Sequence, residues 1–485
     1  MGIMSVCAER APWCFTGGLG DVAAALPGAI RRCSPGVRYG SLTPLYRTAR
    51  EALDAAHRTL TDTGVITEVT VGGLLWTGRV WSLDGETDPD TYFLECDALF
   101  DSPGLYEMAP VIIDGATVTP DLAVRFAFLV EAALQVSADL LGGRVDAYHL
   151  HDWHAAPLAW RLAETVPAQE KPRVALTIHN LAYQGHCSAE AVPEWTTAGD
   201  DGLNFLRKGI EHADLVTTVS PRYSQEIQTP EFGCGLDDLL RERGVVGILN
   251  GAGRGAWDPT ADPHLASAFS GDAPQGRTAC RAALLEEAGW ARDDTALVVG
   301  VVARLDYQKG LDWVAEIVPF LPKMGIRLVL LGTGDPALET RFAALSEAHR
   351  SHFVAWLAFD VPQSHRIMGG ADAVLVPSRF EPCGLTQLYA MRYGALPIVN
   401  AVGGLADTVT DADEVPGEGN GFVMRSGDVD GLRDALQRAV NVWSHNPKRW
   451  ARLVQNGYDY DSSWAQSAQT YLTHLIPPAS QTHSE

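Results

Sequence analysis

The stretch PSRFEPCGLTQLYAMRYGALPIVNAVGGLADT, residues 377–408, decides the fold of this chain. The apolar run directly before it, at residues 373–376, is typical of a buried strand. Ser378, Arg379 and Glu381 therefore fall on the loop after the carboxyl end of that strand. Open α/β sheets bind ligands at this edge. We expect the carboxylate of Glu381 and the guanidinium of Arg379 to lie beside a ligand.

The rest of this stretch repeats the pattern of strand, glycine turn and helix. Residues 384–393 have helical spacing, and residues 396–399 are typical of another buried strand. Gly403 and Gly404 then open a further helix, which leaves backbone amides free to face a ligand. Glycine turns also serve only to connect strands with helices, so this stretch taken alone leaves both interpretations open.

Length and composition describe an ordinary globular protein of several domains. The chain has 485 residues, of which 46% are hydrophobic and 20% charged. This length suggests about two to three domains. The net charge of -23 argues against duplex nucleic acid or an anionic membrane surface as partners, because both need a clustered basic face. A few local Arg and Lys side chains can still form a pocket for a small anion.

The sequence patterns of a signal peptide, a membrane span and a Cys-x-x-Cys motif are not seen in this sequence. Residues 1–9 lack the basic region and the long apolar core of a signal peptide. No apolar run approaches the roughly 18 residues that a membrane span needs. Eight cysteines are scattered without Cys-x-x-Cys pairs, which favours reduced thiols over disulfides or zinc. We expect a cytosolic protein.

A glycine-rich turn lies near the amino terminus. Residues 3–7 form an apolar strand candidate, the turn TGGLGD follows at residues 16–21, and residues 22–30 have helical spacing. This arrangement aims backbone N–H groups at a phosphate or a sugar oxygen. Glycines at such turns equally serve helix–strand packing, so the turn alone does not decide between the two roles.

The first half of the chain has the pattern of a parallel-sheet domain with an antiparallel addition. Alternating apolar segments at residues 65–71, 74–81 and 91–94 predict antiparallel strands. A long helix is predicted over residues 120–141, where apolar side chains share one face. The repeated order of strand, loop and helix, continuing to a strand at residues 214–220, predicts the parallel sheet.

Two polar loops in this half follow predicted strands. Residues 149–154, HLHDWH, place two histidine rings on the same side of a strand, with no further carboxylate pair nearby. A metal site, a structural role and a sugar contact by His154 all stay open. The second loop, HNLAYQG at residues 179–185, suits carbohydrate, because His, Asn and Gln bind hydroxyls and Tyr offers an apolar face.

The second half begins with a glycine-rich segment, residues 247–263, which we expect to be an interdomain hinge. A new strand at residues 296–302 leads to Arg304 and Lys309 just before a helix. These cations suit a diphosphate, Arg through its fork and Lys as a point charge, although a solvated surface pair is the alternative. Further apolar runs continue a parallel series. We therefore expect a second doubly wound domain, which faces the first across the hinge.

As a set, these motifs resemble bacterial glycogen synthases and plant starch synthases over nearly the whole chain. The matching segments are TGGLGDV (16–22), HDWH (151–154), HNLAYQG (179–185), DLVTTVSP (214–221), ILNG (248–251), RL and QKG (304–305 and 308–310), SRFEPCGLTQLYAMRYG (378–394) and GGLADTV (403–409). The last two blocks are the most specific of them.

The resemblance implies the α/β GT-B fold, in which two Rossmann-like, doubly wound domains face each other across a cleft. We expect an acceptor-side domain over residues 1–246, joined by a helix at 461–476, and a nucleotide-sugar-binding domain over 247–460. Residues 477–485 are expected to be a disordered tail. The implied activity is retaining transfer of glucose from ADP-glucose to an α-1,4-glucan, glycogen, without a metal or other cofactor, since ADP-glucose is a substrate.

The resemblance also implies which residues act on the donor. Arg304 and Lys309 would hold the diphosphate and stabilise the leaving ADP, because fixed cations favour the charge that grows on the phosphate oxygen. Glu381 would contact the transferred glucose and stabilise its positive charge. The further implied residues of this set are Cys383, Gly384, Leu385, Thr386, Gly403 and Gly404.

In the first half, His154 and Asn250 would orient the sugar. Gly17 and Gly18 would let backbone amides approach the donor, and Asp21 would face the sugar or the acceptor. Tyr183 and Gln184 would belong to the wall of the cleft, and Asn180 is a further implied substrate-binding residue.

Three departures from the family pattern stand out. Phe15 occupies the position of a lysine before the first glycine turn, Ala252 and Gly253 replace a hinge pattern that ends in aspartate, and Asn400 and Val402 stand in place of Arg and Thr. Two alternatives therefore remain beside the leading hypothesis. One is the same fold with another nucleotide-sugar donor or acceptor, and the other is a catalytically impaired glucan-binding relative.

Overall fold

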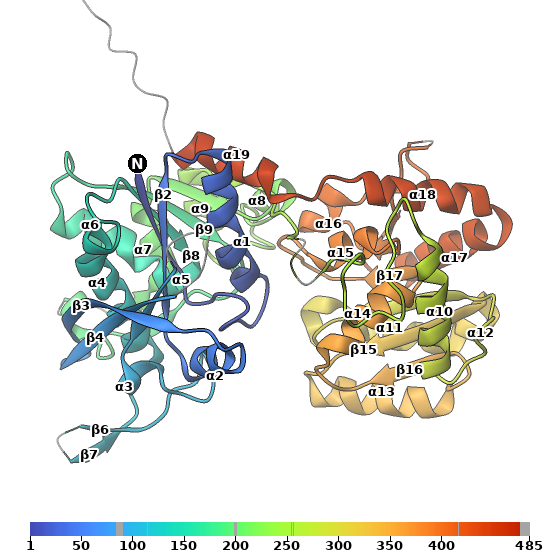
Figure 1. Ribbon diagram of the computed structural model, residues 1–485, viewed down its shortest axis with the longest axis horizontal. Coiled ribbons are helices and arrows are strands. Elements are labelled where there is room, and N and C mark those ends of the chain that lie inside the picture. The colour runs from blue at the N-terminus through green and yellow to red at the C-terminus, as the bar shows by residue number, and fades with distance from the viewer. Residues whose placement is uncertain are drawn as a thin grey trace, which may run out of the picture. The chain divides into compact units, whose positions relative to one another are not determined.

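The computed structural model describes residues 1–83, 91–113, 115–197, 201–253, 255, 257–415 and 417–475 (Figure 1). The expected tail at 477–485 and positions 254 and 256 of the expected hinge lie outside the described residues. The chain forms two compact units. Unit 1 combines Met1–Gly251 with the chain from Trp464 onward, and unit 2 is Ala252–Ser463.

Unit 1 is built on a nine-stranded sheet. Its strands, in spatial order, are β13 (Val246–Gly247), β12 (Leu215–Thr218), β9 (Arg173–Ile178), β8 (Ala147–His151), β1 (Gly2–Val6), β2 (Arg38–Pro44), β5 (Thr91–Glu95), β4 (Leu74–Leu83) and β3 (Leu60–Val71). The strands from β13 to β5 are parallel, whereas β4 runs antiparallel to both β5 and β3. The predicted antiparallel addition to a parallel sheet is confirmed for β3 and β4, whereas β5 joins the two parts, parallel to β2 and antiparallel to β4.

Helices cover both faces of the unit 1 sheet because alternate strand residues point to opposite faces. Ile3 packs into a cluster with α1 (Gly18–Cys33) and α19 (Trp464–Leu475), whereas the adjacent Met4 packs into the larger cluster with α4 (Leu122–Leu140) and α6 (Pro157–Thr165). The other helices are α2 (Arg47–Ala55), α3 (Asp97–Phe100), α5 (Asp152–Ala155), α7 (Phe205–His212), α8 (Pro221–Glu226) and α9 (Asp237–Arg243).

Two small hairpins complete unit 1, β6 (Val111–Ile113) with β7 (Ala116–Val118) and β10 (His186–Ser188) with β11 (Gly202–Asn204). A single 3-10 turn lies at Pro193–Trp195. The sequence patterns predicted neither hairpin.

Unit 2 has a six-stranded, fully parallel sheet. Its spatial order is β16 (Phe353–Trp356), β15 (Ile326–Leu331), β14 (Leu297–Val302), β17 (Ala373–Val376), β18 (Leu396–Val399) and β19 (Phe422–Val423). The sequence therefore winds outward from β14 in one direction and from β17 in the other. This order is that of a doubly wound Rossmann-like sheet, as predicted.

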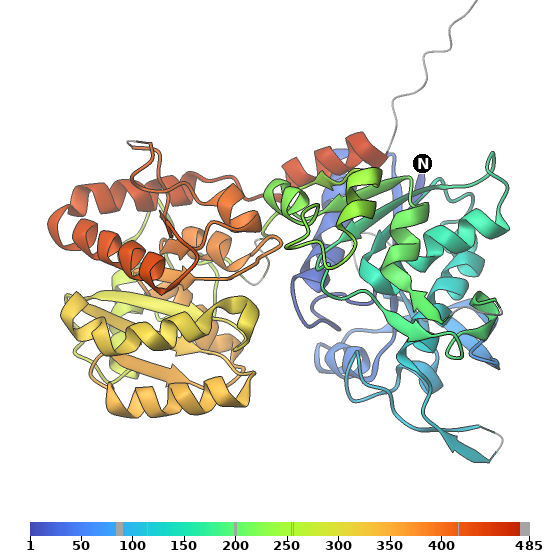
Figure 2. The ribbon, with the colours of Figure 1, turned by 180° about the vertical axis from the view of Figure 1, so that it is seen from behind.

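The unit 2 strands read as continuous apolar runs because both faces of the sheet are buried. Leu297, Val299 and Val301 face one helix layer, and Val298 faces the other. The first layer contains α11 (Leu311–Ile317), α12 (Leu321–Met324), α13 (Pro336–Ala348), α17 (Val429–His445) and α18 (Pro447–Asp459), and the second contains α10 (Gln275–Glu287), α14 (Val361–Gly370), α15 (Thr386–Arg392) and α16 (Gly403–Thr408). The same unit is seen from behind in Figure 2. Two 3-10 turns lie at Tyr307–Lys309 and Val318–Phe320.

The sequence-based expectations about membrane spans and cysteines concern the helices and the thiols of the described residues. None of the helices in the described part of the chain is long and apolar enough to cross a membrane. All eight cysteines are free thiols, and five of them are buried.

Candidate active site

In unit 2, the predicted donor residues follow two neighbouring strands. β14 and β17 pair directly, and the chain winds away from them in opposite directions. Ligands bind at such a switch point, outside the carboxyl ends of the strands. Lys309 follows β14 and Glu381 follows β17, and the structure brings them together, with Lys309 Nζ 2.6 Å from Glu381 Oε2.

Glu381 is only 8% exposed, and the same carboxylate oxygen also accepts a hydrogen bond of 2.7 Å from Ser378 Oγ. A buried carboxylate with an ammonium and a hydroxyl donor is held in one orientation, and its charge is compensated. We did not predict a role for Ser378, although its place three residues before Glu381 on the same loop was a usable signal. Glu381 is therefore a fixed charge rather than a mobile surface carboxylate.

Arg304 is the more exposed of the two predicted cations, with 56% of its side chain accessible. Its Nε lies 2.6 Å from Asp306 Oδ2. Asp306 Oδ1 accepts a hydrogen bond from the backbone N–H of Lys309, so one carboxylate supports both cation-bearing positions. Asp306 was not a predicted site residue.

Arg379 has partners within unit 2 that were not predicted, and its expected place beside a ligand stays a prediction. Its guanidinium does not extend freely beside Glu381 but forms two hydrogen bonds of 2.7 Å with the Asp312 carboxylate. It also lies between the rings of Tyr307 and Trp313, 4.0 and 4.2 Å from their centroids. The backbone N–H of Arg379 donates to Gln308 O. Arg379 thus holds the loop after β17 against the loop after β14, where the planar fork and stacking of arginine are well suited.

The Gly403-Gly404 turn opens α16, as predicted, and contacts Glu381 through the backbone. Gly404 N–H donates to Glu381 O at 3.1 Å. Gly403 has a φ of 43°, and a Cβ there would lie 1.9 Å from Glu381 O. The glycines are required by close packing against the loop that carries the carboxylate. Their proposed approach to substrate remains a prediction.

The other donor-side residues lie at the start of α15. Gly384 has a φ of 70°, and Cys383 is buried. The buried Gln387 side chain donates to the carbonyls of both residues and to Thr408 Oγ1. Leu385 and Thr386 complete the turn into the helix. Gln387 was not a predicted site residue, and it fixes this turn from inside.

The departures at positions 400 and 402 have different structural outcomes. Asn400 is buried, and its Nδ2 donates to Ser378 O at 2.9 Å. Its Oδ1 accepts from the N–H of Ala401. Val402 is the residue before α16 and supplies no side-chain cap. Asn400 therefore supports the Glu381 loop at a position where the family pattern has a long cation.

In unit 1, the corresponding switch point lies between β1 and β8, which also pair directly. The glycine turn follows β1. Gly17 is the extended residue before α1, and a Cβ there would meet no atom within 4 Å. Gly18 is the first residue of the helix. Both glycines are exposed to solvent. Phe15 is 46% exposed, and its Cβ packs against Gly20, where an added Cβ would lie 2.4 Å away.

Two carboxylates lie beside this turn. Glu9 is 3% exposed and accepts hydrogen bonds from Thr16 N at 2.7 Å and Thr16 Oγ1 at 2.8 Å. Burial, with a smaller contribution from the charge of Glu9, raises the pKa of Asp21 from 3.8 to about 6. Asp21 lies in the first turn of α1. Glu9 was not predicted to matter.

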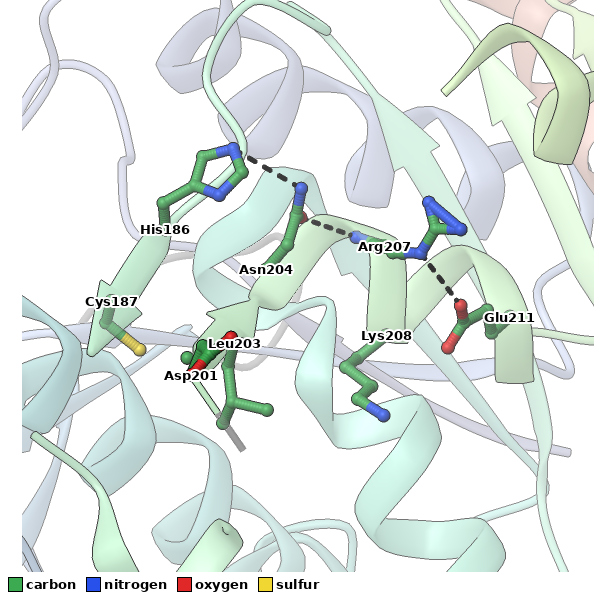
Figure 3. A pocket seen from close by; sticks show the side chains of 9 residues that line it. His186, Cys187, Asp201, Leu203, Asn204, Arg207, Lys208 and Glu211 are labelled. Atoms are coloured by element: carbon green, nitrogen blue, oxygen red, sulfur yellow. Dashed lines mark hydrogen bonds and ion pairs between the residues drawn. The ribbon is translucent and has the colours of Figure 1, made fainter. Parts of the chain in front are cut away.

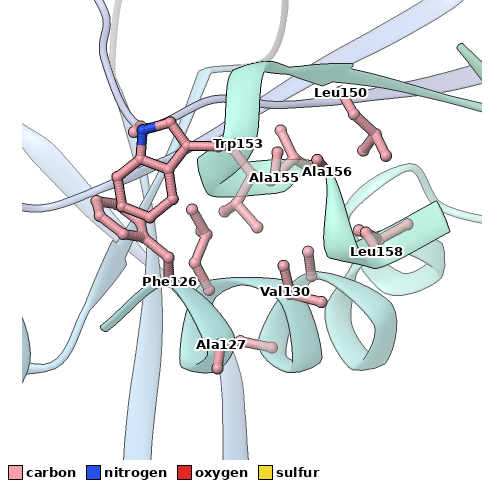
Figure 4. Packing of buried hydrophobic residues seen from close by; sticks show 14 of the residues in the cluster. Phe126, Ala127, Val130, Leu150, Trp153, Ala155, Ala156 and Leu158 are labelled. Atoms are coloured by element: carbon pink, nitrogen blue, oxygen red, sulfur yellow. The ribbon is translucent and has the colours of Figure 1, made fainter. Parts of the chain in front are cut away.

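His154 follows β8 on the short helix α5 and is surrounded by aromatic rings. The Trp153, Phe126 and Tyr106 ring centroids lie 4.2, 4.7 and 5.3 Å from its own. Figure 4 shows Trp153 and Phe126 in the core that supports this corner. Both ring nitrogens of His154 are buried without a hydrogen-bond partner, and burial lowers its pKa to about 3. A neutral imidazole with two unused nitrogens can donate one hydrogen bond and accept another.

The other residues of the HLHDWH motif form an internal network. His149 contacts Tyr39 OH and Thr177 Oγ1, at 2.9 and 2.8 Å. His151 Nδ1 lies 3.0 Å from a nitrogen of His179. Among the described residues, no three His, Cys, Asp or Glu side chains are grouped as they would be to hold a metal ion. These internal hydrogen bonds support a structural role for His149 and His151, one of the alternatives that the sequence left open.

The loop at residues 179–185, which was predicted to suit carbohydrate, contains both exposed and buried side chains. Tyr183 is 58% exposed. Gln184 is buried, where it donates to Leu181 O and Cys234 O and accepts from Asn204 Nδ2. Asn180 accepts from the N–H of Ala182, two residues on. Only Tyr183 presents a large free face, whereas Gln184 stabilises the loop.

A surface pocket of unit 1 lies beside this loop, between β10, β11 and α7 (Figure 3). Arg207 and Glu211 form an ion pair of 3.1 Å at its wall, and the Lys208 ammonium packs over the Trp160 ring. None of the described residues that line this pocket is a predicted site residue. The pocket is thus separate from the strand-end residues described above.

Asn250 lies near the end of the unit 1 segment, and its buried Oδ1 has no hydrogen-bond partner. Beyond it, the residues that replace the family's carboxylate are held through their backbone. Arg392 donates to the carbonyls of Ala252 and Gly253, at 2.7 and 2.6 Å. Ala252 is buried, so this segment is fixed within unit 2 without a carboxylate.

Comparison with known proteins places this chain in a family over nearly its whole length. Residues 2–242 match the family described as starch synthase catalytic domain, and residues 285–460 match glycosyl transferases group 1. A glycogen synthase of Anaeromyxobacter dehalogenans strain 2CP-C is 41% identical over 97% of this chain and 98% of its own length. Glycogen synthase 1 of Rhizobium meliloti is 38% identical over 98% of each chain.

Solved structures of glycosyltransferases are also similar to this chain over nearly its full length. The catalytic domain of starch synthase IV from Arabidopsis thaliana, bound to ADP and acarbose, has a TM-score of 0.84 and 30% identity, with 98% of each chain covered. A sucrose-phosphate synthase from Thermosynechococcus elongatus has a TM-score of 0.58 at 18% identity over 97% of each chain, which shows a shared fold. The chain belongs to the glycogen synthase and starch synthase family of GT-B glycosyltransferases.

Proposed function

We propose that this protein elongates an α-1,4-glucan by transferring glucose from ADP-glucose to its non-reducing end, with retention of configuration. The observation that carries the proposal is the Lys309–Glu381 pair at the switch point of unit 2, in a chain that matches glycogen synthases over nearly its full length. The starch synthase IV neighbour, which is described as bound to ADP and acarbose, supports both the nucleotide and the glucan class.

The unit 2 residues are suited to departure of the nucleotide. As the glycosidic bond to the donor phosphate breaks, negative charge grows on the leaving ADP and the sugar becomes cation-like. Lys309 and Arg304 would stabilise the leaving phosphate, and Glu381 the positive sugar. Because the Lys309 ammonium is 2.6 Å from the Glu381 carboxylate, the carboxylate is already oriented before the donor binds. Ser378 keeps the carboxylate oriented as that ammonium turns toward the diphosphate.

The unit 1 residues are suited to sugar hydroxyls. A hydroxyl both donates and accepts hydrogen bonds, as the neutral imidazole of His154 does. The buried, unpartnered Oδ1 of Asn250 accepts one more. We propose that bound sugar satisfies these polar atoms, since leaving them buried and unpaired costs about 1–3 kcal/mol each. The amides of Gly17 and Gly18 and the ring of Tyr183 would add contacts.

A donor panel tests this proposal. The purified protein is incubated with ADP-glucose, UDP-glucose or GDP-glucose, with glycogen, maltooligosaccharide or no acceptor, and nucleotide release is measured. We expect release that depends on the acceptor and is fastest with ADP-glucose. Preference for another donor would replace the nucleotide assignment. Absence of turnover in every combination, with glucan binding retained, would instead support the catalytically impaired alternative.

A further inference from the structure

We propose that Glu9 is a positioning residue for the sugar-binding part of unit 1, because its carboxylate ties the glycine turn after β1 to the ring that packs on His154 after β8. Three hydrogen bonds make this connection. Thr16 donates to Glu9 through both its N–H and its hydroxyl, and the Tyr106 hydroxyl donates to Oε1. The inference rests on the proposed function in that His154 and Gly17 are taken to contact the sugar.

The turn is fixed from its first residue. Thr16 directly precedes Gly17, whose backbone is extended and whose surroundings are open. With both polar groups of Thr16 held by a buried carboxylate, the direction of the following amides is set before a ligand arrives. Gly20 N–H donates to Gly17 O, which closes the turn from the other side. A preorganised turn of this kind avoids the cost of ordering it on binding.

Orientation of the His154 ring depends on packing alone. A histidine ring is normally oriented by a hydrogen bond at one nitrogen, but neither nitrogen of His154 has a partner. The Tyr106 ring is stacked on it with an interplanar angle of 27°. Because the Tyr106 hydroxyl donates to Glu9, sliding of this ring would break a hydrogen bond to a carboxylate, which is among the stronger kinds.

Tyr106 is itself well supported. Burial, together with the charge of Glu9, raises the pKa of Tyr106 far above its usual value, so its hydroxyl stays a donor at every working pH. Its loop is held by the fully buried Arg125, which donates to Leu99 O, Ser102 Oγ and Glu107 O. The loop, the tyrosine and the carboxylate therefore form one connected support beneath the two ligand-facing segments.

Three variants and one control test the inference. Tyr106→Phe removes the hydroxyl and keeps the ring, Glu9→Gln removes the charge and keeps the size, and a third variant combines both. Tyr92→Phe is the control, since Tyr92 is a buried tyrosine of unit 1 whose hydroxyl donates to Leu140 O, which is not part of the proposed site. For each, kcat, the KM values of donor and glucan, and the thermal midpoint are measured.

We expect kcat to fall about tenfold in each single variant, because small displacements of positioning groups cost up to a hundredfold in rate. The double variant should lose little more, since both changes break the same link. Tyr92→Phe should keep its kcat at a similar thermal midpoint. A kcat within twofold of wild type in Tyr106→Phe, and in Glu9→Gln if that variant folds, would overturn the inference.

A second measurement does not depend on turnover. The His154 ring signal, assigned in the NMR spectrum of histidine-labelled protein with the help of His154→Gln, should shift in Tyr106→Phe and stay unchanged in Tyr92→Phe. Inactive wild-type protein would refute the proposed function but leave this comparison intact. An unmoved His154 signal in Tyr106→Phe would refute the positioning role even in an active enzyme.

Discussion

Lys309 and Glu381 form the most informative pair of residues in the chain, and Lys309 can be removed without disturbing the support that Ser378 gives to Glu381. If Lys309 stabilises the leaving diphosphate, Lys309→Ala should cost about 3 kcal/mol in the transition state, roughly a hundredfold in kcat. The exposed Lys323 of the same unit supplies the control, Lys323→Ala, with normal kcat. A loss of less than about threefold for Lys309→Ala would remove it from this role.

Phe15 tests whether the family's lysine is needed here. Its ring is 46% exposed, so an ammonium can replace it without being buried. A new charge beside the donor phosphates is worth about 1.5 kcal/mol or more, which predicts a donor KM lowered about tenfold in Phe15→Lys. Phe15→Met, without a charge, should leave the donor KM unchanged. Equal donor KM values for wild type and Phe15→Lys would show that position 15 lies away from the phosphates.

Asp152 gives a pH-dependent prediction. Burial raises its pKa from 3.8 to about 7, against the hydrogen bonds that its carboxylate accepts from the backbone N–H groups of His179 and Asn180. The folded chain therefore keeps a proton that the unfolded chain releases. Stability from this group is present at low pH and is lost as the pH rises from about 4 to 7.

Asp152→Asn should remove this dependence. Asparagine accepts the same backbone hydrogen bonds and tolerates the φ of 56° at this position. The free energy of unfolding in urea is to be measured for both proteins. The difference between Asp152→Asn and wild type should grow by about 2–4 kcal/mol in favour of the variant from pH 5 to pH 8. Asp139→Asn, at an exposed position of the same unit, should follow wild type at every pH. Parallel stability curves for Asp152→Asn and wild type would contradict the assignment.

The sequence predicted short-range chemistry better than the direction of long side chains. Glu381 and Lys309 were placed correctly at strand ends, because a strand and its following loop are local features. The partners of the Arg379 guanidinium were not predicted, since Asp312, Tyr307 and Trp313 are distant in sequence. The supporting role of Glu9 depends on equally distant contacts with Tyr106.

At the level of elements, α16 begins with a glycine, Gly403, that packs against the loop that carries Glu381. Gly403→Ala would place a Cβ 1.9 Å from Glu381 O and force that loop to move. We expect kcat to fall at least tenfold, because a misplaced charge of this kind loses transition-state contact. Gly417→Ala is the matched control, since Gly417 also has a positive φ of 86° but would meet no atom within 4 Å. Similar activity of both variants would contradict the packing argument.

Elements buried on both faces were the easiest to predict. The parallel strands of unit 2 are continuous apolar runs, and the three identified by residue number from the sequence, β14, β17 and β18, are present. The hairpin β6–β7 was missed because its strands have three residues each and all of β7 is exposed, so no burial pattern marks it. Two-residue strands such as β19 are defined only by their neighbour in the sheet.

At the scale of the whole molecule, the two large sheets share one topological feature. In each unit, the winding direction reverses between two paired strands, β1 with β8 and β14 with β17. The TGGLGDV motif follows β1, the HDWH motif begins at the last residue of β8, and the segments with Lys309 and Glu381 follow β14 and β17. They lie at these two points because no connection crosses the ends of the strands there. The return of the chain to unit 1 is also explained, since Tyr471 and Leu475 of α19 are fully buried in the cluster with α1. From the sequence, this return could be anticipated only through family resemblance.

The central claim is that a glucosyltransferase centre is organised around Glu381. Its most direct test is glycogen-dependent ADP release from ADP-glucose by wild type and by Glu381→Gln, with thermal unfolding of both proteins recorded. We predict that the variant unfolds like wild type and loses at least a hundredfold in kcat, because a neutral amide cannot stabilise the positive sugar. Unimpaired turnover by a folded Glu381→Gln would contradict the account.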